Sequence, residues 1–326
     1  MRIRALGRCL CASALTCILL LGAGPALAQT TRPEPAQADQ LTPEELKARS
    51  ERFQARVDEA ARALDNDPRL KKFTHKQRKD MVEFVVGNML FALVHEMGHA
   101  HVTEMGLPVL GREEDAADSY AVLAMLRVGS AVSHDVLVQA TKGWFLTDQR
   151  EKKEGIKPAF YDEHGMNQQR AYQIVCLMVG SDPEKFTDLA NSVKLPQDRQ
   201  GTCQGDYSNA SWSWETVLKP HLRAADRPKQ KIEVAYGPAT GKYEPIAQAF
   251  RSIRLLEALA DYASTRFVWR APFTIEAQTC GQPDTHWDIS VHKLLTCYEM
   301  AADFAILYRD YALLKGTPKN QKRKAK

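Results

Sequence analysis

Long apolar runs are scarce in this chain of 326 residues. Beyond the N-terminal segment, the most apolar stretch runs from Met81 to Val94 and is interrupted by Glu83, Gly87 and Asn88. A helix needs about 20 predominantly apolar residues to cross a membrane. We therefore expect no transmembrane segment in the mature chain. The sequence also lacks an internal repeat.

Most of the chain has no excess of basic over acidic residues. The formal net charge is +4, but it comes from the two ends: three arginines at the N-terminus and six basic residues in segment 315–326. Without these, the basic residues are fewer than the 40 acidic ones. Such a body does not predict nucleic acid as a partner. We expect 315–326 to be a basic, disordered tail, with weak contact to an anionic envelope surface as an alternative role.

The N-terminal 28 residues have the layout of a secretory signal peptide. Arg2, Arg4 and Arg8 precede an apolar run over 12–21, and Ala26-Leu27-Ala28 follows. The run is short for a membrane anchor and ends in an Ala-x-Ala cleavage pattern. We expect export to the periplasm or the exterior. Segment 29–42, rich in Pro, Gln, Ala and Glu, is expected to be a disordered lead-in, followed by a single folded domain over 43–314.

Cysteine is scarce, and three of the seven cysteines lie in the predicted signal peptide. The other four are Cys176, Cys203, Cys280 and Cys297. An even count in an exported chain favours two disulfides, and the grouping along the sequence predicts the pairs Cys176–Cys203 and Cys280–Cys297. A thiolate metal site is the alternative, but no Cys-x-x-Cys is present to support it.

The segment His95-Glu96-Met97-Gly98-His99 carries the strongest chemical signal. His95 and His99 stand one helical turn apart, so both imidazoles project from one face and can hold one metal ion. Glu96 lies between them and can reach water bound at that metal. We therefore predict a Zn2+ site with Glu96 as the general base of a hydrolysis.

A catalytic zinc normally takes three protein ligands, so a third must come from elsewhere. Gly and Pro residues in 103–111 end the first helix, and a second helix begins near Arg112. It carries Glu114 and Asp118 at positions i and i+4. We assign Glu114 as the third ligand and Asp118 as the carboxylate that orients a ligand imidazole. Glu113 and Asp115 remain alternative ligands, although each points about 100° away from Glu114.

A loop over 160–165 supplies a second element of the predicted site. Peptide hydrolysis develops negative charge on the carbonyl oxygen, and a side-chain donor usually stabilises it. His164 is the first candidate for this role, with Tyr161 and Arg170 behind it. In the alternative interpretation, Asp162 caps the following helix and His164 only packs.

Hydrophobic periodicity predicts a mainly helical α+β protein with a small sheet in the C-terminal half. The stretch 76–101 is apolar on most sides, which predicts a buried central helix that carries the metal motif. Trp212, Trp214 and Trp287 are assigned to the core. The other expected helices cover 43–65, 113–128, 133–152, 168–179, 183–193, 211–222, 244–269 and 298–314, and the expected strands cover 231–236, 272–277 and 293–298.

The two motif helices resemble those of gluzincin-like zinc metallopeptidases, the group that includes membrane-bound CAAX-prenyl and heat-shock proteases. Over most of the mature chain, the sequence is similar to a family of secreted bacterial "putative metallopeptidases" that is still called a domain of unknown function. The residues that carry this wider resemblance are His95 to His99, Leu107 to Asp115, Asp162-Glu163-His164, Cys176 and Cys297-Tyr298-Glu299. The resemblance implies zinc-dependent cleavage of a peptide or protein substrate.

The residues and the resemblance together predict an exported zinc-dependent peptidase. His95, His99 and Glu114 would hold zinc, and Glu96 would activate the bound water. The alternative is a zinc-stabilised envelope or binding protein that cleaves nothing. A hydrolase of amide bonds in cell-wall peptides is a third interpretation.

Overall fold

The computed structural model describes residues 42–312 apart from positions 66 and 225. The predicted signal peptide, the lead-in before Thr42 and the tail over 315–326 lie outside these residues. The helices are α1 (Pro43–Ala63), α2 (His75–Met105), α3 (Glu113–Val128), α4 (Ala131–Glu154), α5 (Asn167–Ser181), α6 (Pro183–Ser192), α7 (Gln197–Gln200), α8 (Cys203–Leu218), α9 (Glu244–Ile253), α10 (Leu255–Arg266) and α11 (Tyr298–Leu307), and the strands are β1 (Glu233–Tyr236), β2 (Thr274–Gln278), β3 (Thr285–Asp288) and β4 (Lys293–Cys297). The prediction of a mainly helical α+β fold with a C-terminal sheet is confirmed.

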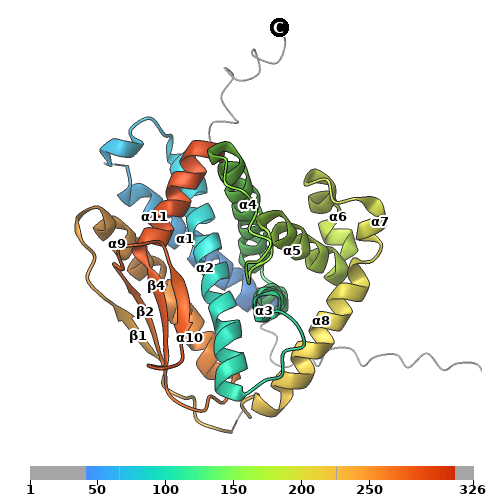
Figure 1. Ribbon diagram of the computed structural model, residues 1–326. Helices are drawn as coiled ribbons and strands as arrows, with labels where there is room; N and C mark the ends of the chain where they lie inside the picture. The colour runs from blue at the N-terminus through green and yellow to red at the C-terminus, as the bar shows by residue number, and fades with distance from the viewer. Residues whose placement is uncertain (1–41, 66, 225, 313–326) are drawn as a thin grey trace, which may run out of the picture. The chain divides into compact units, whose positions relative to one another are not determined.

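Helix α2 lies at the centre of the described fold. Phe84, Met89, Leu93 and Met97 are fully buried along it, because apolar residues occur on all its sides. Helices α3, α4 and α5 lie on one side of α2, and the sheet with α9 and α11 lies on the other (Figure 1). By length and composition α2 could cross a membrane, but 72% of its most apolar window is buried inside the protein. Its position is that of a core helix, as the sequence predicted.

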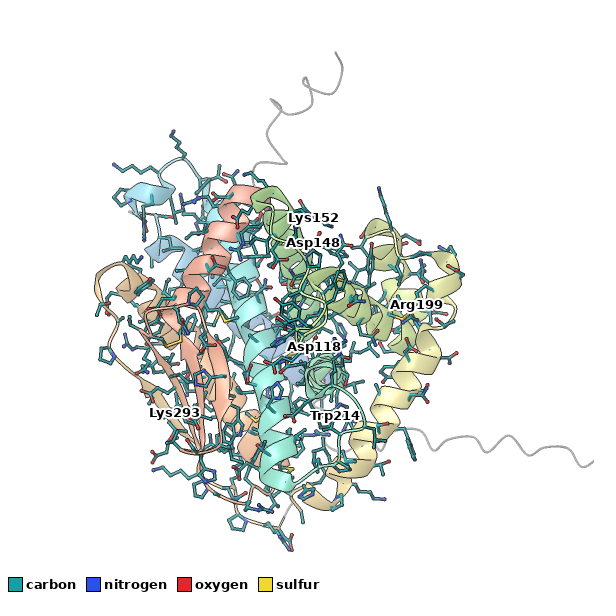
Figure 2. All side chains as sticks on the ribbon, viewed as in Figure 1. Asp118, Asp148, Lys152, Arg199, Trp214 and Lys293 are labelled. Carbon is teal, nitrogen blue, oxygen red and sulfur yellow. A yellow bond between two sulfur atoms is a disulfide. The ribbon has the colours of Figure 1, made fainter. Side chains whose placement is uncertain are left out.

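The end of α2 fixes where the chain turns toward α3. Gly106 adopts a left-handed φ of 63° and donates its N–H to the carbonyl of Val102. Glycine adopts this conformation without steric cost and commonly ends helices in this way. The chain then reverses over 107–112, and α3 returns across α2 to pack against α8. Trp214 of α8 donates to Ser119 Oγ at 3.0 Å and packs on Tyr120 of α3 (Figure 2).

The four-stranded sheet has the order β1-β2-β4-β3. Strands β1, β2 and β4 are parallel, and β3 pairs antiparallel with β4 at the edge. Ile275, Ala277 and Leu294 are fully buried, so one face of the sheet belongs to the core. The outer edge of β3 faces α2, and this places a strand beside the metal motif.

Several boundaries differ from the prediction. The helix expected over 244–269 is two helices, because Arg254 adopts a left-handed φ of 59° and ends α9 before α10 begins. This break lets both Ile253 and Leu255 point into the core. The helix expected over 211–222 begins earlier, at Cys203, and ends at Leu218. Strand β3 and helix α7 were not predicted. The assignment of Trp212 to the core was wrong, because 51% of it is exposed.

Two disulfides brace the fold. Cys176 of α5 is bonded to Cys203 of α8, with 5.0 Å between their Cα atoms. Cys280, which follows β2, is bonded to Cys297 of β4, with 5.5 Å between their Cα atoms. These are the pairs that the sequence predicted, and they leave none of the four sulfurs as a thiolate for a metal.

Candidate active site

The crossing of α2 and α3 is tight at one point, Gly98 against Ala117. A Cβ built on Gly98 would lie only 2.9 Å from the Cα of Ala117 and 3.1 Å from its Cβ. Only glycine facing a small residue allows two helix backbones to approach so closely. The residues on either side of this contact, His95 and His99 on α2 and Glu114 on α3, are therefore brought together.

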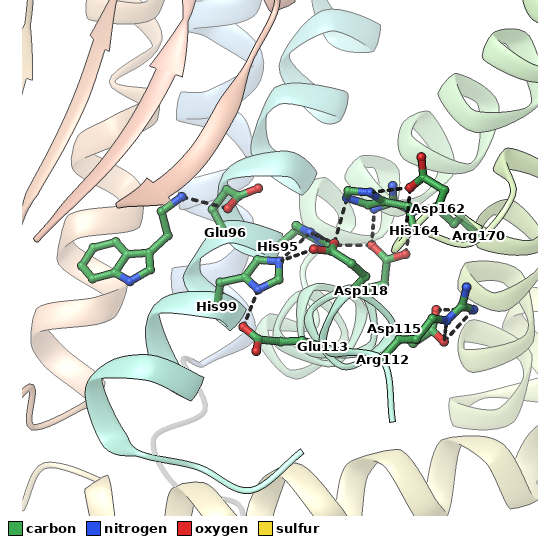
Figure 3. A network of polar contacts seen from close by, with 12 residues as sticks. His95, Glu96, His99, Arg112, Glu113, Asp115, Asp118, Asp162, His164 and Arg170 are labelled. Carbon is green, nitrogen blue, oxygen red and sulfur yellow. Dashed lines mark hydrogen bonds and ion pairs between the residues drawn. The ribbon is translucent and has the colours of Figure 1, made fainter. Parts of the chain in front are cut away.

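Three potential ligand residues meet at the crossing (Figure 3). The two Nε2 atoms of His95 and His99 are 3.2 Å apart. Glu114 places Oε2 3.1 Å from Nε2 of His95 and Oε1 3.3 Å from Nε2 of His99. Zinc–nitrogen bonds of about 2.0–2.1 Å in a tetrahedral site put ligand atoms about 3.3–3.4 Å apart. The observed spacing therefore fits one zinc ion held by these three residues.

The outer nitrogens of both imidazoles have carboxylate partners. His95 Nδ1 is 2.8 Å from Asp118 Oδ1, and His99 Nδ1 is 2.8 Å from Glu113 Oε1. An ionised carboxylate only accepts hydrogen bonds, so each Nδ1 carries the proton. When both imidazoles are neutral, their Nε2 lone pairs therefore face each other and the Glu114 oxygens. Such lone pairs repel unless a cation lies between them, and this is the arrangement of metal-binding histidines.

Arg170 of α5 holds Asp118 in place. Its guanidinium donates to both oxygens of Asp118, at 2.6 and 2.7 Å, and lies 3.8 Å from the ring of Trp144. This two-point contact is the geometry in which arginine fixes a carboxylate most firmly. Arg170 was predicted as a donor to the substrate. The structure instead gives it a positioning contact, one residue removed from the potential ligand His95.

The two alternative ligands have other partners. Glu113 binds the outer nitrogen of His99, on the opposite side of the ring from Glu114. Asp115 pairs with Arg112 at 2.9 and 3.0 Å, and its side chain is 54% exposed. Of the three acids in the first turn of α3, Glu114 alone has its carboxylate between the two inner nitrogens.

The charges in this cluster favour an added cation. Burial alone would lower the pKa of His99, yet the carboxylates of Glu114 and Glu113 raise it to about 9. Burial alone would raise the pKa of Glu114, but hydrogen bonds from His164, His95 and His99 bring it well below its usual range. These carboxylates therefore stabilise positive charge on the imidazoles. A metal ion competes with protons for the same nitrogens and takes their place when it binds.

Glu96 lies beside the potential ligands. It offers an oxygen within 4.8 Å of a nitrogen on His95 and on His99. Its Oε2 accepts a hydrogen bond of 3.0 Å from the backbone N–H of Trp287 in β3. Burial raises the pKa of Glu96, as is common for carboxylates that act as general bases. The strand contact was missed, because Trp287 was assigned only to the core and nothing in its short surrounding segment predicted a strand.

The loop between α4 and α5 brings His164 to the same cluster. His164 Nε2 is 2.9 Å from Glu114 Oε2, and His164 Nδ1 is 3.2 Å from Asp162 Oδ1. The proposed capping role of Asp162 was wrong, because α5 is capped at Met166. Tyr161 is 94% exposed, so among the three predicted donors His164 has the contact closest to the potential ligands.

A polar cavity of about 620 Å³ borders the cluster. Its lining includes Asp118, Gly165, Arg170, Tyr172, Leu195 and Arg199. None of His95, His99, Glu114 and His164 lines this cavity, so it meets the cluster at Asp118, the partner of His95.

Residues 59–218, from α1 to the end of α8, match a family model described as "Putative metallopeptidase". This segment belongs to that family. The match includes all three potential ligands, Glu96 and His164, but it stops before β3. Membership supports a hydrolase that acts on peptide or protein substrates with a metal. No curated protein and no solved structure matches the chain.

Proposed function

We propose that the protein is an exported, zinc-dependent peptidase in which Glu96 is the general base. The observation that carries the proposal is the position of Glu96, which lies half-buried beside the converging imidazoles and accepts a hydrogen bond from a backbone N–H of β3. A metal site that only stabilises a fold needs no such carboxylate next to its ligands.

His95, His99 and Glu114 would hold the zinc ion. A zinc ion held there would polarise the scissile carbonyl and make a water molecule more acidic. Glu96 then accepts the proton of the attacking water and passes it to the departing amine nitrogen. The Trp287 N–H engages one carboxylate oxygen and thereby orients the other toward the reaction. His164, near Glu114, is placed to donate to the developing oxyanion.

The test compares Glu96→Gln with Glu83→Gln. Both glutamates are on α2, and burial raises the pKa of both, but Glu83 lies three helical turns away from the imidazoles. Gln at position 96 keeps an oxygen that accepts from Trp287, so the fold and the zinc content should persist. We expect Glu96→Gln to cleave a peptide library at least about 100-fold more slowly, because a general base typically contributes that much.

Glu83→Gln should cleave like the unmodified protein, and a chelator should abolish cleavage in both. The rival function is a zinc-stabilised binding protein. Equal cleavage by the unmodified protein, Glu96→Gln and the chelated sample would show background activity only, and this outcome would leave the binding protein as the better interpretation.

A further inference from the structure

His164 is the third histidine of the cluster, and its surroundings repeat those of the other two. Each imidazole places Nδ1 against a carboxylate: Asp118 for His95, Glu113 for His99 and Asp162 for His164. Each therefore carries its proton on Nδ1 and directs Nε2 toward Glu114.

The distance of His164 from Glu114 is compatible with a metal ion that both residues bind. Its Nε2 is 2.9 Å from Glu114 Oε2, which is closer than either His95 or His99 comes to that carboxylate. Ligand atoms of His95, Glu114 and His164 all lie within 4.8 Å of one another. The planes of the His164 and His95 rings are 24° apart, with 6.3 Å between ring centroids. A nitrogen in this position can reach a metal held by Glu114.

The attachment of His164 differs from that of the helical residues. The side chains of His95 and His99 are 6% and 15% exposed, on a rigid central helix, whereas that of His164 is 41% exposed, on the loop over 155–166. This loop begins at Gly155, which has a left-handed φ of 73°, and it carries Phe160 and Tyr161 with most of their surface in solvent. Loop side chains with few buried contacts move at a lower cost than packed helical ones.

We propose that His164 is a fourth protein ligand that closes the metal site in the resting protein, and that displacement of the 155–166 loop opens it. This inference rests on the proposed function. Four protein ligands complete a tetrahedral zinc site, whereas catalysis requires one position free for water or substrate. Once it has left the metal, Nε2 of His164 can take up a proton, and only in that form can it donate to the developing oxyanion.

The test uses the holoprotein loaded with zinc or with Co2+ and compares His164→Ala with His286→Ala. His286 is a matched control, because it is 44% exposed and places Nδ1 2.9 Å from Asp284, two residues before it. X-ray absorption at the zinc edge should count three imidazoles in the unmodified protein and two in His164→Ala. Competition with a chelator should show that His164→Ala binds zinc about 10- to 100-fold more weakly. Loss of a residue that only hydrogen-bonds to a ligand already weakens binding by that much.

The visible spectrum of bound Co2+ should change in His164→Ala and stay unchanged in His286→Ala. A small hydroxamate should bind the His164→Ala metal faster, because no imidazole has to leave first. If the Co2+ spectrum and the zinc affinity of His164→Ala equal those of the unmodified protein, His164 is not a ligand. This result would leave the peptidase proposal intact, because Glu96→Gln tests that proposal separately. An unmodified protein that binds no zinc at all would overturn both.

Discussion

Substitution of Gly98 by alanine tests whether the close approach of α2 and α3 builds the metal site. Within a helix, alanine is favoured over glycine by about 1 kcal/mol. At this position, however, the new Cβ would lie 2.9 Å from the Cα of Ala117. Ordinary carbon contacts need about 3.5–4.0 Å, so the two helices must separate by roughly 0.6 Å or more. Overpacking of this kind typically costs about 1–3 kcal/mol.

The separation should weaken zinc binding more clearly than it weakens the fold. Metal–ligand distances tolerate only about ±0.2 Å, and moving α3 carries Glu114 away from both imidazoles. We expect Gly98→Ala to lower zinc affinity roughly 10- to 100-fold, the range seen when ligands lose their positioning. The free energy of unfolding of metal-free Gly98→Ala, measured in urea, should be lower by up to about 2 kcal/mol once the gain in helix propensity is included.

Gly205→Ala is the matched control. Gly205 is also helical, in α8, and a Cβ built there meets nothing within 4 Å. The free energy of unfolding of this variant should rise by up to about 1 kcal/mol, and its zinc affinity should equal that of the unmodified protein. The reasoning would be refuted if Gly98→Ala gained stability like Gly205→Ala and kept its zinc affinity.

Two further predictions concern the ligands and the disulfides. Glu114→Ala should leave the purified protein with little zinc by metal analysis, whereas Glu113→Ala should still bind one equivalent with affinity about 10- to 100-fold lower; the reverse result would exchange their roles. Replacing both Cys176 and Cys203 by serine should lower the free energy of unfolding, measured in urea, by about 2–4 kcal/mol. Peptide mapping of exported protein without reductant should recover this disulfide. Four alkylatable thiols in that material would contradict the pairing.

The helical part of the fold was predictable because its signals are local. Helix α2 is apolar on all sides and ends at a glycine, and the N-terminus of α1 shows Thr42 followed by Pro43 and two acids. The left-handed residue at Arg254 carries no such signal, since arginine rarely adopts that conformation. The single helix predicted there had to be divided once the structure was known.

The first half of the site was predictable for the same reason. His95 and His99 are one turn apart, so their convergence follows from helix geometry alone. The contact of His164 with Glu114 spans fifty residues, and that of Trp287 with Glu96 spans 191. No periodicity encodes contacts between such distant segments. The sequence did indicate that His164 belongs near the site, but it did not indicate how close to Glu114 it lies.

The burial of Glu96 also bears on the choice between an enzyme and a binding protein. Burying a carboxylate disfavours its charged form, and the pKa of Glu96 stays raised although the imidazoles of His95 and His99 and the N–H of Trp287 offset part of that cost. In the metal-free protein, Glu96→Gln should therefore be at least as stable as the unmodified protein at neutral pH, even though it loses activity. A residue retained only for stability would show the opposite, a clear loss on substitution. Because functional carboxylates are typically kept at a cost in stability, a gain in unfolding free energy together with a loss of cleavage would mark Glu96 as a residue that serves the reaction.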